Sequence, residues 1–272
     1  MAPAIDELET GWRRLSTSPN SEAALAERRS LLDRAWADTG GASRVDLLAG
    51  YVRGMDVLDL GCRGYGASGA SNSLAHALHG VARSYLGADV EVSSGPSAAR
   101  DQPVVHLDVS EGAQAAMRAL HGRAFDAVVA GEILEHLARP DTLFEVADVA
   151  LRPTGILVLS TPNPYAPHRA YRGLRRDTWE SADHVLYGFP SGLAELADRC
   201  GFTLASWTTV GWTSRRARLR ESVLGLVRRI SGTPVAALPV SYLPLFQLLP
   251  LLRRWHLRPI GETMVCRFTR RA

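Results

Sequence analysis

The chain of 272 residues is long enough for one large domain with an insertion, and a domain of this size buries roughly 70% of the surface that its unfolded chain exposes. Its net charge of +3 is unevenly spread: residues 213–272 carry 12 arginines against two acids, a net +10, which leaves −7 on residues 1–212. The three cysteines show neither metal-ligand spacing nor a disulfide pattern, and the N-terminus lacks a signal-peptide pattern, so we expect a cytoplasmic protein.

The order of predicted elements indicates an α/β fold. Residues 22–36 repeat apolar side chains at helical spacing, and beyond them short apolar runs alternate with helical stretches, as in a parallel sheet with helices on both faces. The predicted strands are 56–60, 84–88, 104–107, 125–130, 156–160, 203–209 and 263–268. The predicted helices between them are 71–79, 112–120, 141–151 and 189–200. The expected units are an N-terminal helical cap (1–50), a core (51–212), an insertion (213–261) and the last core strand (262–272).

The loop after the first predicted strand has two interpretations. Gly64, Gly66 and Gly69 spell GxGxxG, the pyrophosphate fingerprint of dinucleotide-binding folds. Asp59, however, would repel a pyrophosphate, whereas S-adenosylmethionine (SAM) has no phosphate and offers an ammonium and a sulfonium. One charge pair at about 4 Å near a protein surface is worth on the order of 4 kcal/mol, so the sign of the charge decides. Asp59 therefore favours SAM over NAD.

Polar residues follow the other predicted strands as well. Ligands of open parallel sheets bind outside the carboxyl ends of the strands, where this chain has Asp89, Asp108, Gly131 and Glu132. Asp89 is suited to accept both ribose hydroxyls, and Gly61 would let the backbone approach the ligand. Any single acid is equally well explained as a helix cap, but a row of them points to a binding edge.

Four motifs carry a resemblance to a known family: Val-Leu-Asp-Leu-Gly-Cys (57–62), Gly-Ala-Asp (87–89), Phe-Asp-Ala-Val-Val (125–129) and Glu-Ile-Leu-Glu-His-Leu (132–137). They resemble class I SAM-dependent methyltransferases, and within these the ubiquinone-pathway O-methyltransferase type. The similarity covers residues 44–211 and the last strand. It implies a Rossmann-like, seven-stranded, mostly parallel sheet whose last strand runs antiparallel.

The resemblance also implies roles for individual residues. Asp108 would approach the adenine amino group, Gly131 would line the methionine end, and Arg44 would meet the methionine carboxylate. The family loop reads Asp-x-Gly-x-Gly-x-Gly, whereas here Arg63 and Tyr65 occupy the places of its second and third glycines. The implied SAM-binding residues are Asp59, Gly61, Gly64, Asp89, Asp108 and Gly131.

Two acids and two histidines raise the question of a metal. The resemblance implies that Glu132, Glu135, His136 and His184 hold Mg²⁺, which would clamp two vicinal hydroxyls of the acceptor. Such an ion would lower the pKa of the acceptor oxygen and position it for attack. The alternative is that Glu135 and His136 belong to a helix start. His136 or His184 would then be the general base, because imidazole titrates near neutrality.

The insertion over residues 213–261 combines arginines with a 22-residue uncharged run, 231–252. The run is long enough to span a bilayer, but four prolines break it, and a span would separate the last strand from its sheet. We expect the insertion to dock on an anionic membrane surface, with a lid over the substrate pocket and a dimer contact as alternatives. Nucleic acid is disfavoured because few aromatic residues lie between the arginines.

Taken together, the sequence predicts a methyltransferase that transfers a methyl group from SAM to an oxygen of a small-molecule, lipid-linked or glycosidic acceptor. Two alternatives remain. One is a terminal RNA 2′-O-methyltransferase, and the other is a cofactor-binding module that has lost catalysis through its altered loop.

Overall fold

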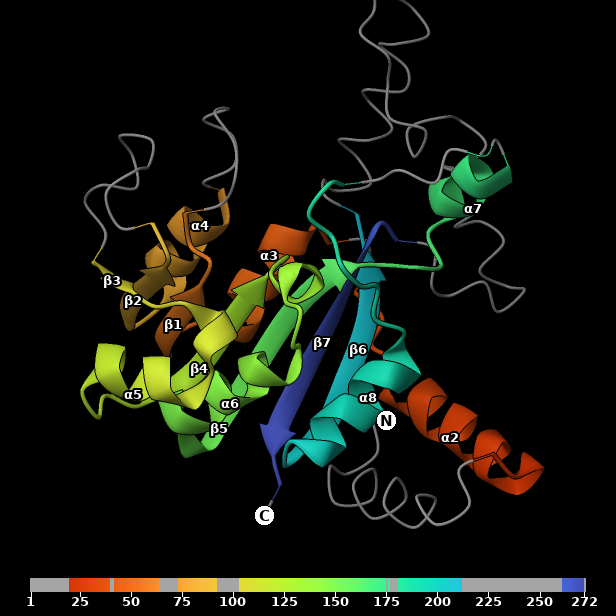
Figure 1. Ribbon diagram of the computed structural model, residues 1–272, viewed down its shortest axis with the longest axis horizontal. Coiled ribbons are helices and arrows are strands. Elements are labelled where there is room, and N and C mark those ends of the chain that lie inside the picture. Colours follow the sequence, from red (N-terminus) through yellow and green to blue (C-terminus); the bar gives the residue numbers. More distant parts are fainter. Residues whose placement is uncertain are drawn as a thin grey trace, which may run out of the picture.

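The computed structural model describes residues 20–39, 42–63, 73–91, 103–174, 176, 181–211 and 261–271. Within these residues one sheet has the strand order β3-β2-β1-β4-β5-β7-β6 (Figure 1). Neighbouring strands are parallel, except that β7 runs antiparallel to both β5 and β6. The predicted Rossmann-like fold is confirmed. The strands are β1 (Asp56–Leu60), β2 (Ser84–Asp89), β3 (Val104–His106), β4 (Phe125–Gly131), β5 (Leu151–Pro162), β6 (Phe202–Val210) and β7 (Thr263–Arg270).

The helices include every predicted helical stretch and two that were not predicted, α3 and α7. Ser43 caps the start of α3 by accepting a hydrogen bond from the backbone N–H of Asp46, a Ser-x-x-Asp pattern that sequence reasoning missed. The helices are α2 (Glu22–Ala35), α3 (Arg44–Tyr51), α4 (Ser73–Val81), α5 (Ala113–Leu120), α6 (Asp141–Ala150), α7 (Pro167–Leu174) and α8 (Pro190–Arg199), with short 3-10 turns η2 (Val109–Glu111) and η3 (Leu134–His136).

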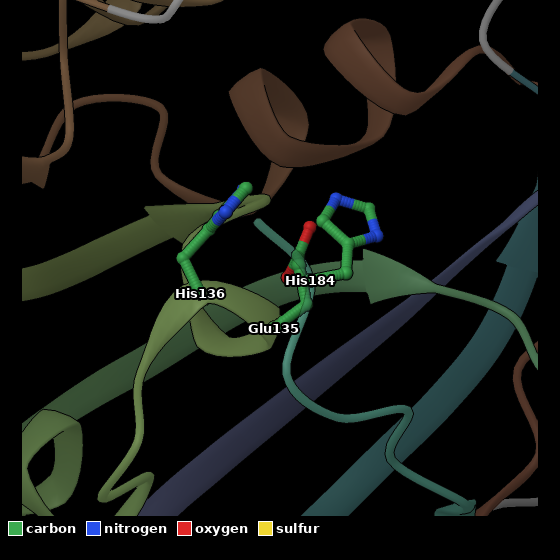
Figure 2. A group of neighbouring side chains, drawn as sticks. All are labelled: Glu135, His136 and His184. Atoms are coloured by element: carbon green, nitrogen blue, oxygen red, sulfur yellow. The ribbon is translucent and has the colours of Figure 1, made fainter. Parts of the chain in front are cut away.

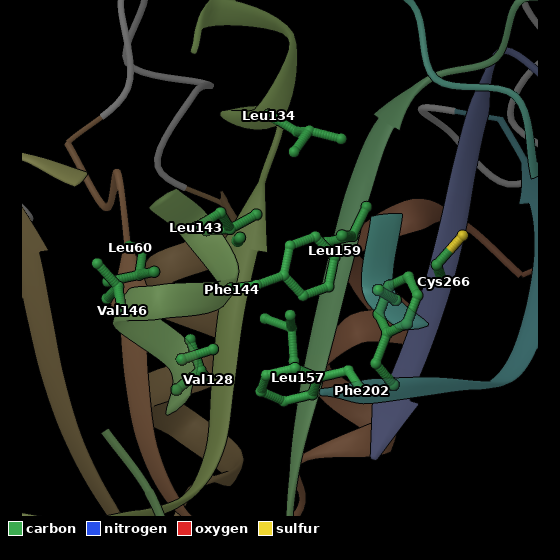
Figure 3. Packing of buried hydrophobic residues seen from close by; sticks show 14 of the residues in the cluster. Leu60, Val128, Leu134, Leu143, Phe144, Val146, Leu157, Leu159, Phe202 and Cys266 are labelled. Carbon is green, nitrogen blue, oxygen red and sulfur yellow. The ribbon is translucent and has the colours of Figure 1, made fainter. Parts of the chain in front are cut away.

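The sheet is buried on both faces because successive strand residues point to opposite sides. Val57 and Val129 pack with α3 and α4, whereas Leu58 and Val128 pack with α5, α6 and α8. Figure 3 shows Phe144 of α6 at the centre of the second cluster. Its ring lies 5.6 Å from that of Phe202 and 5.4 Å from that of Phe268. This core fixes the strands whose carboxyl ends form the site.

The N-terminal cap that the sequence predicts is described from residue 20 onward, where α2 packs against β6 and α8. The indole N–H of Trp207 on β6 donates to the carbonyl of Leu32 at 2.7 Å, and the Trp36 ring meets the Trp207 ring edge-on at 4.8 Å. The cap therefore covers the edge of the sheet farthest from β3.

An ion-pair network closes the amino ends of the strands. Arg83 donates to both carboxylate oxygens of Asp56, at 2.9 and 2.7 Å, and Arg152 bridges Asp56 and Asp126. These arginines hold the pKa of the Asp56 carboxyl well below its usual range. Two acids facing two arginines balance each other's charge at this end of the sheet.

The insertion and the glycines of the opening loop lie largely outside the described residues. Residues 64–72 and 212–260 belong to the parts that are not described, which includes Gly64 and nearly all of the insertion. The flanks of the insertion do meet, because Gly261 donates its N–H to Thr209 Oγ1 at 3.1 Å beside the end of β6. Among the helices that the structure describes, none has the length and apolar character to cross a bilayer.

Candidate active site

Asp59 lies at the carboxyl end of β1 with only 2% of its surface exposed. The hydroxyl of Tyr85 donates to its Oδ2 at 2.8 Å. Burial raises the pKa of the Asp59 carboxyl to about 7, although Tyr85 and the positive charge of Arg44 act in the opposite direction. The carboxyl group is therefore buried at the carboxyl end of β1, where a cation bound beside it would favour its charged form.

The turn after β1 requires small residues at two places. Gly61 has a φ of +68°, and a Cβ there would also lie 3.2 Å from Ile133 Cδ1. A Cβ on Gly87 of β2 would lie 2.6 Å from Cys62 Sγ, so Gly87 makes room for the cysteine that follows Gly61. Gly61 therefore adopts a backbone conformation that favours glycine, and Gly87 leaves room for the side chain of Cys62.

Asp89 and Asp108 each fasten a loop with their carboxylates. Asp89 accepts the N–H of Arg63 on Oδ2 at 2.8 Å and the N–H of Glu91 on Oδ1 at 3.0 Å. Asp108 uses Oδ1 to cap η2, accepting from the N–H and hydroxyl of Ser110. Because each carboxylate oxygen has two lone pairs, both acids retain acceptor capacity for a ligand.

Arg44 enters the site from the first residue of α3 and is 8% exposed. Its Nη1 donates to Ser160 Oγ at 3.0 Å and lies 3.9 Å from Glu132 Oε1. A Cβ on Gly131 would lie 3.1 Å from the same nitrogen and 2.6 Å from Leu74 Cδ2. Gly131 therefore leaves the space in which the guanidinium reaches the end of β4.

Glu132 itself has a φ of +58°, a left-handed backbone conformation that is uncommon for a residue with a side chain. Its N–H donates to the carbonyl of Ser160 at 2.9 Å, which fixes the turn between β4 and η3. Such conformations cost roughly 1 to 3 kcal/mol and concentrate at functional sites. Here the conformation separates Glu132, which faces Arg44, from Glu135, which faces the histidines.

Glu135, His136 and His184 form a cluster in which one ligand atom from each residue lies within 4.8 Å of the others. We call it the carboxylate–imidazole cluster; Figure 2 shows its side chains extending to the same side from η3 and from the segment before α8. Glu135 is fully buried and accepts the hydroxyl of Thr161 on Oε2 at 3.0 Å, while its Oε1 has no hydrogen-bond partner. Burial, assisted by the charge of Glu132, raises the pKa of Glu135 to about 8.

The segment that carries His184 is hydrogen-bonded to η3. The N–H of Val185 donates to the carbonyl of Glu135 at 2.8 Å, and the rings of His136 and His184 meet edge-on at 4.8 Å. Asp183, which sequence reasoning did not single out, places Oδ2 3.0 Å from His136 Nδ1. Its only sequence signal was its position next to His184.

The structure thus brings together three of the four side chains predicted to hold a metal, Glu135, His136 and His184. Glu132 lies against Arg44 instead. Sequence reasoning missed Tyr85, Ser160 and Thr161 as partners of site residues, because their contacts join elements that are far apart in the sequence.

Comparison with known proteins decides the family. A sequence profile described as "Methyltransferase domain" matches residues 29–206, more than half of the chain. The chain belongs to this methyltransferase family. The enzyme class that the sequence predicted, a SAM-dependent methyltransferase, is confirmed. Among curated protein sequences, none matches this methyltransferase.

Solved structures resemble this methyltransferase in fold. A SAM-dependent methyltransferase from Archaeoglobus fulgidus has a TM-score of 0.51 and 16% identity, over 84% of this chain and 91% of the other. A SAM-dependent methyltransferase from Mesorhizobium loti has a TM-score of 0.47 and 18% identity, over 85% and 99%. Magnesium protoporphyrin IX methyltransferase from Synechocystis has a TM-score of 0.43 and 15% identity, over 74% and 87%. The seven-stranded architecture agrees with the first of these.

The side chains of this methyltransferase suit SAM in charge and in space. Asp59 is buried and Asp89 is half-buried, so both place negative charge at the carboxyl ends of β1 and β2, which suits a ligand with cations and no phosphate. The close approach of Arg44 to Gly131 adds one positive charge at the end of β4, where a carboxylate would find a partner. The arrangement matches a ligand with both an ammonium and a carboxylate.

Proposed function

We propose that the enzyme transfers the methyl group of SAM to an oxygen of a small-molecule acceptor whose hydroxyl binds at the carboxylate–imidazole cluster. The observation that carries this proposal is the convergence of Glu135, His136 and His184 beside the end of β4. A carboxylate and two imidazoles are groups that remove or stabilise the removal of a hydroxyl proton, which transfer to oxygen requires. The ubiquinone-pathway resemblance of residues 132–137 supports a lipid-linked or glycosidic acceptor with neighbouring hydroxyls.

The cofactor would be held by the residues that line the strand ends. SAM supplies an electrophilic methyl group on a sulfonium when it is bound. Asp59 would attract its ammonium, Asp89 would accept its ribose hydroxyls and Asp108 would accept from its adenine amino group. Gly61 keeps the turn close enough for backbone contact, and Arg44 would pair with the methionine carboxylate.

The cluster has the donor set of a divalent-cation site. The buried Oε1 of Glu135, which has no hydrogen-bond partner, is an acceptor that a cation would satisfy. A bound cation would lower the pKa of the acceptor hydroxyl and orient its oxygen. Two imidazoles and one carboxylate suit Mn²⁺ or another first-row ion better than Mg²⁺, which prefers oxygen ligands. Glu132 would contribute an oxygen only by leaving Arg44.

A metal-free mechanism uses the same residues with different roles. Asp183 Oδ2 lies 3.0 Å from Nδ1 of His136, where its charge would stabilise the imidazolium that forms when Nε2 takes the proton of the acceptor hydroxyl. His184 packs edge-on against that ring. Chelation distinguishes the two mechanisms, because a histidine base works without an ion.

Replacing either strand-end acid should weaken cofactor binding. We expect Asp59→Asn and Asp89→Asn each to reduce SAM affinity by about 1 to 3 kcal/mol, because each removes a charged acceptor. Isothermal titration calorimetry measures the effect, with Asp148→Asn on the exposed face of α6 as a matched control. Wild-type affinity in both variants would contradict the assignment of these two residues, and NAD should not bind.

Competition by small hydroxyl compounds can show which kind of acceptor the cluster binds. If the cluster binds neighbouring hydroxyls through an ion, a catechol probe should compete with the acceptor better than a phenol probe of similar size. Comparison of metabolites between a deletion strain and its parent would then identify the unmethylated acceptor. Equal competition by both probes would favour a single hydroxyl at the histidine base.

We propose further that residues 213–261 dock the enzyme on an anionic membrane surface, which the +10 charge of residues 213–272 supports. Each arginine near such a surface contributes about 1 kcal/mol, and salt screens the attraction. Co-sedimentation with liposomes should therefore require acidic lipid and weaken as salt rises. Arg228→Glu with Arg229→Glu should reduce it, whereas Arg29→Glu with Arg53→Glu, on exposed residues of the body, should reduce it less. If the protein fails to bind acidic liposomes at low salt, the insertion is instead a lid over the substrate pocket or an oligomer contact.

A further inference from the structure

Tyr85 has no role in the chemistry described so far, although it contacts Asp59 at the carboxyl ends of the strands. It lies on β2, beside Val57 of β1, and only 8% of its surface is exposed. Its hydroxyl reaches along the sheet to donate to Asp59 Oδ2 at 2.8 Å. The ring packs edge-on against His79 of α4 at 5.6 Å, which limits where the hydroxyl can point.

Two charged groups, Arg44 and Asp89, act on the Asp59 carboxyl from different elements. Arg44 approaches from α3 and favours the ionised carboxylate, whereas Asp89 at the end of β2 opposes it. The Cys62 thiol is neutral at physiological pH, because burial and the two neighbouring acids raise its pKa to about 12. Burial dominates and raises the pKa of Asp59 to about 7, so the carboxyl changes its charge near neutral pH. Tyr85 donates a hydrogen bond of 2.8 Å to the carboxylate itself.

We propose that Tyr85 is a positioning residue for the cofactor, whose hydroxyl holds the Asp59 carboxylate in its charged form and in a fixed place. This inference rests on the proposed role of Asp59 in binding SAM. Burial and the nearby acids raise the pKa of Tyr85 well above its usual range, so the phenol stays protonated and remains a donor. A buried carboxylate without this donor would more readily take up a proton and lose its attraction for an ammonium.

The direction in which pH changes SAM affinity follows from the titration of Asp59. SAM affinity should rise as pH increases through the pKa of Asp59, since the ionised form binds the cofactor's ammonium. Removing the hydroxyl raises that pKa further. We expect Tyr85→Phe to move the midpoint of the affinity profile upward by about one pH unit, so that affinity at pH 7 falls about 5- to 10-fold and the difference shrinks near pH 8.

Calorimetry of SAM binding between pH 6 and 8 tests the proposal. The matched control is Tyr51→Phe, on α3, whose ring faces Arg267 rather than Asp59 and whose profile should not move. In an Asp59→Asn background, Tyr85→Phe should change affinity by the same factor at every pH. A Tyr85→Phe profile that keeps the wild-type midpoint, or one lowered equally at all pH values, would overturn the inference.

A second measurement does not depend on SAM. Carbon-13 NMR of the aspartate carboxyls gives the pKa of Asp59 directly, and it should be higher in Tyr85→Phe than in the wild type. An unchanged carboxyl pKa overturns the proposed role of Tyr85. If instead the wild-type protein fails to bind SAM while the carboxyl pKa shifts as expected, the cofactor role of Asp59 is wrong and the contact with Tyr85 still stands.

Discussion

Glu135→Gln is expected to slow acceptor methylation by about 100- to 1,000-fold while leaving SAM affinity within about twofold of the wild type. The substitution keeps the size of the side chain and an acceptor for Thr161, but it removes the negative charge that the cluster would use to hold an ion. Single-turnover rates with the identified acceptor measure the loss, and calorimetry measures cofactor binding. Glu145→Gln on α6, outside the cluster, serves as the matched control and should retain activity.

Chelation separates the two mechanisms for this cluster. If an ion is used, EDTA should abolish activity in the wild type, and Mn²⁺ should restore it at lower concentration than Mg²⁺ because two imidazoles are present. SAM binding should persist in the chelator. Full activity in EDTA would contradict the ion and favour His136 as the general base. If Glu135→Gln were fully active as well, the cluster would have no part in the reaction.

Glu135→Gln should also stabilise the metal-free protein at alkaline pH. Burial moves the pKa of Glu135 from an ordinary 4.5 to about 8, so the cost of ionising it is absent below pH 4.5 and complete above pH 8. Glu135→Gln removes that cost, and the free energy of unfolding at pH 9 should rise by about 2 to 4 kcal/mol. Urea denaturation in EDTA at pH 5 and pH 9 tests this, since the gain should largely vanish at the lower pH.

Arg44→Met is expected to weaken SAM binding by about 100-fold or more and to lower the free energy of unfolding by about 3 kcal/mol. The guanidinium is the buried positive charge beside Glu132 and Asp59, and methionine keeps much of its apolar stem without the charge. Calorimetry and urea denaturation measure the two effects. Arg53→Met, an exposed residue of the turn after α3, should change neither.

A double variant distinguishes cofactor binding from a general loss of stability. Adding Glu132→Gln to Arg44→Met removes the uncompensated acid, so stability should recover in part while SAM affinity stays low. Recovery of both would mean that Arg44 acts only by neutralising Glu132. Wild-type SAM affinity in Arg44→Met alone would rule out Arg44 as the partner of the methionine carboxylate.

The sequence alone determined the fold and the edge of the sheet that carries the site. Short apolar runs such as Val57-Leu58 and Val128-Val129 are a local property, and because successive strand residues point to opposite faces they specify strands buried on both faces. The acids that follow the strands were equally visible, because the carboxyl ends of parallel strands always meet at one edge. Helix α3 was predictable from the cap at Ser43, but α7 spans only eight residues and is polar on average, so no apolar run marks it in the sequence.

Only the tertiary structure decided which side chains meet. Glu132 and Glu135 look alike in sequence, yet the left-handed backbone at Glu132 turns one acid toward Arg44 and leaves the other with the histidines. The hydrogen bond from Tyr85 to Asp59 depends on the register between β1 and β2, which no local pattern encodes. Contacts between distant segments arise from how the elements pack, so the sequence supplied the candidate residues and the packing selected their partners.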